Sequence, residues 1–139
     1  MTKILLVEDS KFIRLATERA LARAGYAVSI ASDGEDAIAA ALQNPPDLIL
    51  LDLLLPKMGG QEVLKALKRD PLTARIPVVV LTGMSEKNSQ RLRNDGAHAF
   101  LGKESLALDK NSEGLLAAVA RILGELQLET PPGAVAAGK

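Results

Sequence analysis

Apolar residues in this chain of 139 residues follow two patterns that alternate along the sequence. Short, nearly uninterrupted apolar runs predict strands, and between them apolar residues recur at helical spacing. The predicted strands are residues 4–7, 27–31, 48–52, 76–81 and 99–101. The predicted helices are residues 13–24, 37–42, 61–69, 85–95 and 112–126. Strand and helix therefore alternate five times, which favours an α/β fold with a parallel sheet.

The order of the strands in the sheet can be predicted from how apolar each strand is. Leu48 to Leu51 is apolar at every position, as expected of a strand buried on both faces. Ala27 to Ala31 alternates between apolar and polar positions, as expected at a sheet edge. We therefore expect a doubly wound sheet with the order 2-1-3-4-5, right-handed crossovers and helices on both faces. One domain is expected over residues 1–129, followed by a disordered tail at 130–139 that lacks periodicity.

Composition excludes several classes of function. Seventeen basic residues balance seventeen acidic ones, so no strong field attracts nucleic acid or an anionic membrane. The chain has no cysteine and one histidine, which excludes disulfides and sites built from several histidines or thiolates. Apolar runs are too short for a membrane span or a signal peptide. We therefore expect a soluble, cytoplasmic protein.

Four of the five predicted strands end in a residue that can carry chemistry. Glu8 and Asp9 follow the first strand, Asp52 ends the third, Thr82 follows the fourth and Lys103 follows the fifth. Open α/β sheets bind ligands at the carboxyl ends of their strands, and the switch point between strands one and three brings Asp9 beside Asp52. These residues should therefore form one site.

The predicted site is acidic and built from oxygen ligands. Three carboxylates and one lysine leave a net charge of about −2, which a divalent cation would balance. Oxygen ligands at a half-open site suit Mg²⁺ or Mn²⁺. With a cation bound, Asp52 could act as the nucleophile toward a phosphoryl group. Lys103 and the Thr82 hydroxyl would contact phosphoryl oxygens, and Gly83 leaves the approach free of a side chain.

These residues at this spacing resemble a response-regulator receiver domain, and in particular the stand-alone chemotaxis-type receivers. The resemblance covers Lys3 to about Leu126. It implies a flavodoxin-like fold, a phosphoacceptor at Asp52, an acidic pair at Glu8 and Asp9, and a switch hydroxyl at Thr82.

The resemblance also assigns further roles. It implies Mg²⁺ held by Asp9, Asp52 and the backbone carbonyl of Leu54, with Glu8 acting through water. Lys103 would be the family's phosphate-contacting lysine. Phe100, three residues before it, falls on the position of the family's aromatic rotamer switch.

The sequence departs from the family pattern near Lys103. Glu104 follows this lysine where the family usually has a proline in a cis peptide bond, so we expect a trans bond here. The segment from Lys103 to the last predicted helix is also longer than usual. The first difference should change how Lys103 is delivered to the site. The longer segment should alter the surface around the last helix, which receivers commonly use for docking, so the choice of partner cannot be transferred from the family.

Two apolar residues flank the predicted phosphorylation site. Leu54 and Met84 lie two positions after Asp52 and Thr82, where polar residues can hold a water molecule. Because hydrolysis of an aspartyl phosphate needs an aligned water, we expect slow autodephosphorylation.

The resulting hypothesis is a single-domain response regulator that accepts a phosphoryl group on Asp52. The donor would be a phosphohistidine on a sensor histidine kinase or a histidine phosphotransfer protein. In this family the receiver catalyses both this transfer and its own dephosphorylation, but its role is signalling. Because no DNA-binding or catalytic domain follows residue 130, the output is expected to be contact with another protein, and dimerisation on phosphorylation remains open.

Three alternatives remain. The first is a degenerate receiver that binds partners without being phosphorylated. The second is a metal-dependent phosphatase with an aspartyl nucleophile, but Leu54 occupies the place of the second acid that such enzymes use. The third is a carrier of flavin mononucleotide, which the acidic first loop and the scarcity of aromatic residues disfavour.

Overall fold

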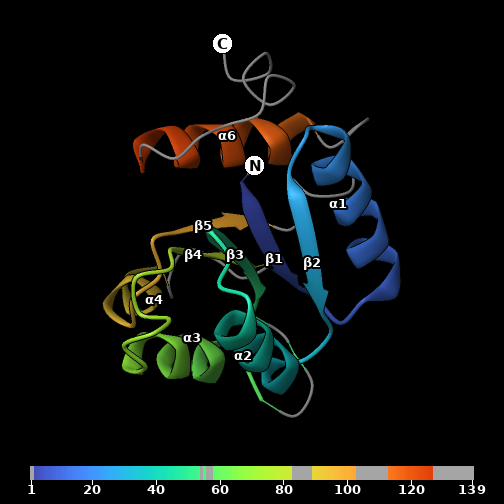
Figure 1. Cartoon of the computed structure of the whole chain (residues 1–139). Coiled ribbons are helices and arrows are strands. Elements are labelled where there is room, and N and C mark those ends of the chain that lie inside the picture. Colours follow the sequence, from blue (N-terminus) through green and yellow to red (C-terminus); the bar gives the residue numbers. More distant parts are fainter. Residues whose placement is uncertain (1, 54, 56–57, 83–88, 103–112, 127–139) are drawn as a thin grey trace.

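Five parallel strands form one sheet, and their carboxyl ends lie at the same end of it (Figure 1). The computed structural model describes residues 2–53, 55, 58–82, 89–102 and 113–126. The strands are β1 (Lys3–Val7), β2 (Ala27–Ala31), β3 (Leu48–Asp52), β4 (Val78–Thr82) and β5 (Ala99–Gly102). The helices are α1 (Lys11–Arg23), α2 (Gly34–Gln43), α3 (Gly60–Arg69), α4 (Ser89–Asn94) and α6 (Glu113–Glu125). The strand order is β2-β1-β3-β4-β5, which confirms the predicted doubly wound topology.

The register of the strands brings their ends together. Val7, at the end of β1, lies opposite Ala31 of β2 and Leu51 of β3. One step further along the sheet, Asp52 lies opposite Leu81 of β4. The C-terminal end of the sheet therefore brings together the loop after β1, the end of β3 and the end of β4.

The leucine-rich strand β3 divides its side chains between two cores. Leu48 and Leu50 belong to the core that α1 and α6 cover. Ile49 and Leu51 belong to the opposite core, which α2, α3 and α4 cover. Figure 1 shows α6 and α1 on one side of the sheet and α2 and α3 on the other. Because a strand alternates its side chains, an unbroken apolar run serves two helical layers at once.

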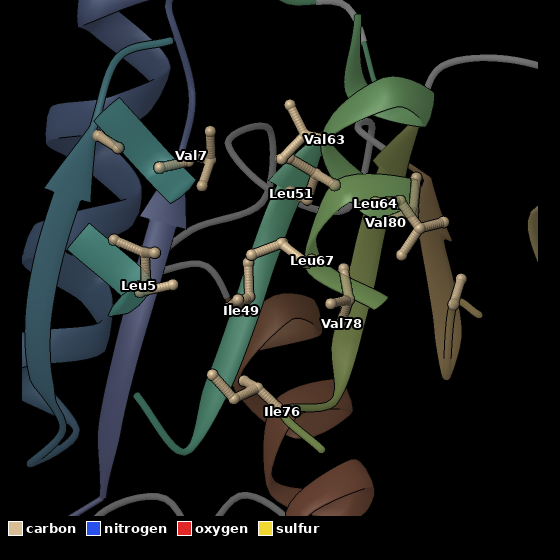
Figure 2. Packing of buried hydrophobic residues seen from close by; sticks show 14 of the residues in the cluster. Leu5, Val7, Ile49, Leu51, Val63, Leu64, Leu67, Ile76, Val78 and Val80 are labelled. Carbon is tan, nitrogen blue, oxygen red and sulfur yellow. The ribbon is translucent and has the colours of Figure 1, made fainter. Parts of the chain in front are cut away.

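The second of these cores shows how the strands meet a helix. In Figure 2 the side chains of β3 and β4 lie beneath α3, from which three apolar residues reach toward them (Val63, Leu64 and Leu67). All five residues of β3 are buried, whereas β2 is partly exposed at the edge. The predicted central and edge positions are therefore confirmed.

Capping residues set the ends of two helices. The Ser10 Oγ accepts a hydrogen bond of 3.4 Å from the Ile13 N–H and begins α1, and Gly25, with φ of 100°, follows its end. Asp33 caps α2 by accepting a 2.9 Å bond from the Asp36 N–H. The side-chain oxygens of these caps replace the helical partners that the first N–H groups lack.

Some element bounds differ from the sequence prediction. β4 begins at Val78 instead of Ile76, because Pro77 has no N–H to donate and the Ile76 N–H is used in a turn to Thr73. α3 begins one residue early, at Gly60, and the described part of the fourth helix is Ser89–Asn94. The predicted start of that helix at Ser85, the segment 103–112 and the tail 130–139 lie outside the described residues.

Candidate metal and phosphoacceptor site

Three carboxylates gather where β1 and β3 end. Glu8, Asp9 and Asp52 each place a carboxylate oxygen within 4.8 Å of the others. Glu8 and Asp52 are completely buried, whereas Asp9 is exposed. The cluster therefore has two carboxylates fixed in the interior and one at its solvent side.

Asp52 is held by the chain that follows it. The Leu53 N–H donates to the Leu81 carbonyl at 3.1 Å, and the Gly60 N–H donates to the Leu53 carbonyl at 3.0 Å. A Cβ on Gly60 would lie 2.6 Å from the Asp52 carbonyl oxygen and from Leu53 Cα. Only glycine fits this close approach of two backbones, which ties the start of α3 to the end of β3.

The loop that carries Glu8 and Asp9 is tied down at each residue. The Glu8 N–H donates to the Ala31 carbonyl at 3.1 Å, and the Glu8 Oε2 accepts from the Ser10 N–H at 3.1 Å. Arg14, one turn into α1, donates from Nη1 to the carbonyl oxygens of Glu8, at 3.2 Å, and Asp9, at 3.4 Å. The acidic loop is therefore held in place by hydrogen bonds to both β2 and α1.

The donor set fits a hard divalent cation. Ionised carboxylates this close repel one another, and burial of two of them strengthens the repulsion. Three oxygen donors at the rim of a sheet match the preference of Mg²⁺ and Mn²⁺ for carboxylates and water. Glu8, Asp9 and Asp52 are thus suited to hold such an ion.

The structure describes only some of the other predicted site residues. Thr82 is the last residue of β4 and pairs with Gly102 of β5, the residue before Lys103. Both strands therefore end at the same end of the sheet as Asp52. Lys103 itself lies outside the described residues, as do Leu54, Gly83, Met84 and Glu104. Phe100 lies in β5, half-buried against the core of α2, α3 and α4, and the Arg93 guanidinium stands over its ring.

Sequence reasoning missed Arg14, Ser10 and Gly60. A helix-start signal was available for Ser10, because a serine precedes an apolar helical pattern. Nothing in the periodicity indicates that Arg14 turns back toward the loop, or that Gly60 meets the backbone of β3.

The chain is thus an α/β protein with an acidic cluster at the topological switch point between β1 and β3, where open α/β sheets bind their ligands. Residues 4–111 match the response regulator receiver domain, and this chain belongs to that family. The family membership confirms the resemblance seen in the sequence.

Relatives of the chain include larger regulators. It is 41% identical over 109 residues to the gliding motility regulatory protein of Myxococcus xanthus, covering 77% of this chain and 14% of that protein. It is 38% identical over 109 residues to the transcriptional regulatory protein AfsQ1 of Streptomyces coelicolor, covering 78% of this chain and 43% of the relative. The chain thus spans less than half the length of these two proteins.

Solved structures of similar proteins support the fold over nearly the whole chain. The chemotaxis response regulator CheY4 of Vibrio cholerae is 35% identical with a TM-score of 0.80, covering 88% of this chain and 99% of that one. The receiver domain of a sensor histidine kinase from Pseudomonas aeruginosa, with magnesium in its active-site cleft, is 27% identical with a TM-score of 0.74, covering 89% and 95%. The Mn²⁺-bound form of the response regulator Rcp1 is 34% identical with a TM-score of 0.72, covering 95% and 99%.

The described helices were also compared with the requirements of a bilayer. None of them is long and apolar enough to span a membrane.

Proposed function

We propose that this chain is a phosphoacceptor whose Asp52 receives a phosphoryl group with Mg²⁺ or Mn²⁺ bound to the acidic cluster. The observation that carries the proposal is the grouping of Glu8, Asp9 and Asp52, with oxygens within 4.8 Å, at the switch point of a receiver fold. The metal-bound relatives support the choice of cation.

The proposed reaction transfers a phosphoryl group from a histidine nitrogen to a carboxylate oxygen. A carboxylate oxygen of Asp52 attacks the phosphorus of a phosphohistidine, the P–N bond breaks, and the imidazole nitrogen leaves with the electron pair. Asp52 suits this role because it ends a fully buried strand whose position is fixed on both sides. A bound divalent cation would offset the negative charge of the carboxylates and of the phosphoryl oxygens.

The other proposed roles follow the strand ends. Asp9, Asp52 and the backbone carbonyl of Leu54 would hold the metal, with Glu8 acting through water. The Thr82 hydroxyl and the Lys103 ammonium would contact the phosphoryl oxygens, and Gly83 would leave room for the incoming group. Phe100 would change its orientation when Thr82 moves, which shifts an equilibrium between two surfaces.

The proposed donor is a sensor histidine kinase or a histidine phosphotransfer protein, and the proposed output is contact with another protein. The family supports this class of donor. One relative is a receiver domain within a sensor histidine kinase, and others are transcriptional regulators. These names come from different kinds of assembly, so the downstream protein is left unspecified.

The decisive experiment is intact-mass analysis after incubation with acetyl phosphate and Mg²⁺. We expect a mass increase of one phosphate in the unmodified chain and in Asp36→Asn, a matched change at an exposed aspartate of α2. Asp52→Asn should show no increase. Loss of the mass shift on removal of the metal would support the role of the cluster.

The same experiment distinguishes the phosphoacceptor from a degenerate receiver. A chain that gains no phosphate under these conditions, although it folds, would be a binding module that acts without phosphorylation. A shift that persists in Asp52→Asn would move the phosphoacceptor to another residue.

A further inference from the structure

We propose that Arg14 is a positioning residue of the acidic site, which sets the affinity for the divalent cation by fixing the loop that carries Glu8 and Asp9. The inference rests on the proposed function, because it takes these carboxylates to be metal ligands. It assigns Arg14 no contact with the metal or the phosphoryl group.

The geometry ties one nitrogen to two consecutive peptide units. Arg14 Nη1 lies 3.2 Å from the Glu8 carbonyl oxygen and 3.4 Å from that of Asp9. Neither peptide can rotate without losing a hydrogen bond from a charged donor. Both bonds end on main-chain oxygens, so Arg14 holds the loop without occupying the carboxylates.

Asp9 depends on this hold more than Glu8 does. The Glu8 carboxylate is buried and accepts from the Ser10 N–H, which orients it independently of Arg14. Asp9 is exposed, and within the described residues no hydrogen bond to its carboxylate is found. The direction of the Asp9 side chain therefore follows from the backbone that Arg14 fixes.

The place of Arg14 in α1 is not explained by helix stability. The first turn of α1 contains no acidic residue, and Lys11 and Arg14 are basic residues near the end where a helix favours negative charge. A half-buried arginine at this position gains its stabilisation from the contacts with the loop.

Charge and positioning predict opposite effects of removing Arg14. If the guanidinium acted only as a nearby positive charge, its removal would strengthen Mg²⁺ binding, because like charges repel. If it positions the loop, its removal weakens binding by about tenfold, as is typical for residues that orient metal ligands. The sign of the change separates the two explanations.

The test is calorimetric titration of the full chain with Mg²⁺, together with the free energy of unfolding measured without metal. Arg14→Met should bind about tenfold more weakly than the unmodified chain. Arg19→Met removes the same charge from an exposed position of α1 and should change the affinity less than twofold. Arg14→Lys keeps the charge but not the planar guanidinium and should fall between the two.

The outcomes separate this inference from the proposed function. If the unmodified chain does not bind Mg²⁺, the proposed metal site is wrong and the inference fails with it. If the unmodified chain binds and Arg14→Met binds as well as Arg19→Met does, Arg14 is only structural, even if the variant is less stable. Should Arg14→Met not fold, an affinity of Arg14→Lys equal to that of the unmodified chain overturns the inference.

Discussion

The guanidinium carbon of Arg93, in α4, lies 4.9 Å from the centroid of the Phe100 ring in β5. A cation at this distance over an aromatic face is attracted by the negative charge density of the ring. The contact joins α4 to Phe100, for which we proposed a switch role. It therefore favours the orientation of Phe100 seen here.

Arg93→Ala should weaken the hold on Phe100. We expect the free energy of unfolding to fall by about 0.5–1 kcal/mol, because Arg93 is exposed and such contacts are weak near water. A double-mutant cycle with Phe100→Leu measures the coupling directly, and Arg121→Ala, at an exposed site of α6, is the control. Purely additive losses in the cycle would show that the two side chains do not interact.

Gly60→Ala should destabilise the fold, although alanine is the better helix former. The added Cβ would lie 2.6 Å from the Asp52 carbonyl oxygen, so the backbone must shift at a cost of about 1–3 kcal/mol. Gly124→Ala is the matched control in α6, where a Cβ would meet nothing within 4 Å, and it should stabilise by about 0.5–1 kcal/mol. Urea unfolding measures both, and equal effects of the two changes would contradict the close approach at Gly60.

Tyr26 should make the folded state sensitive to alkaline pH. Burial raises the pKa of the Tyr26 hydroxyl to about 12, and its oxygen has no hydrogen-bond partner among the described residues. Between the unfolded pKa of 10 and the folded pKa of about 12, the folded chain keeps a proton that the unfolded chain has lost. The titration of Tyr26 should therefore leave the free energy of unfolding unchanged below pH 10. As the pH rises toward 12, the unfolded chain gains from losing the proton, and the free energy of unfolding should fall by up to about 2–3 kcal/mol.

Tyr26→Phe isolates this contribution. The variant should be as stable as the parent at pH 7, or more stable by up to about 1 kcal/mol, because a buried hydroxyl without a partner costs free energy. Above pH 10 its free energy of unfolding should fall less steeply than that of the parent. Parallel curves for the two proteins between pH 9 and about pH 12 would show that Tyr26 does not titrate differently on folding.

The aspartyl phosphate should persist for minutes or longer in Mg²⁺. Leu54 and Met84 offer no side-chain donor or acceptor to hold the attacking water, so Leu54→Asn is expected to speed hydrolysis by about tenfold. The decay of the phosphorylated mass after removal of the phosphodonor gives the rate. Leu42→Asn, at a partly exposed site of α2, should leave it unchanged, and decay of the parent within seconds would refute the prediction.

The sequence predicted the sheet better than it predicted the site. The unbroken apolar run at Leu48–Leu51 was enough to place β3 at the centre, because a strand covered by helices on both faces is apolar at nearly every position. The same uniformity hides which leucine faces which core. That assignment depends on the packing of α1 and α6 against one face and of α2 and α3 against the other.

At the site, neighbouring residues turned out to have different environments. Glu8 and Asp9 are adjacent and both acidic, yet one is buried and the other exposed. The difference comes from the direction of the loop, which is fixed by hydrogen bonds to Arg14 in the next helix and to Ala31 in a neighbouring strand. Such contacts leave no periodic signal in the sequence.

The burial of every residue of β3 has a consequence for how the protein opens. Amide hydrogens of a strand enclosed on both faces exchange with solvent only when the whole domain unfolds, whereas edge strands and short helices open locally. We therefore expect Asp52 to be among the slowest-exchanging residues, so that local melting of β3 would not relay a chemical change there. The hydrogen-bonded ladder offers another route, from β3 through β4 to β5, whose Phe100 contacts Arg93 of α4.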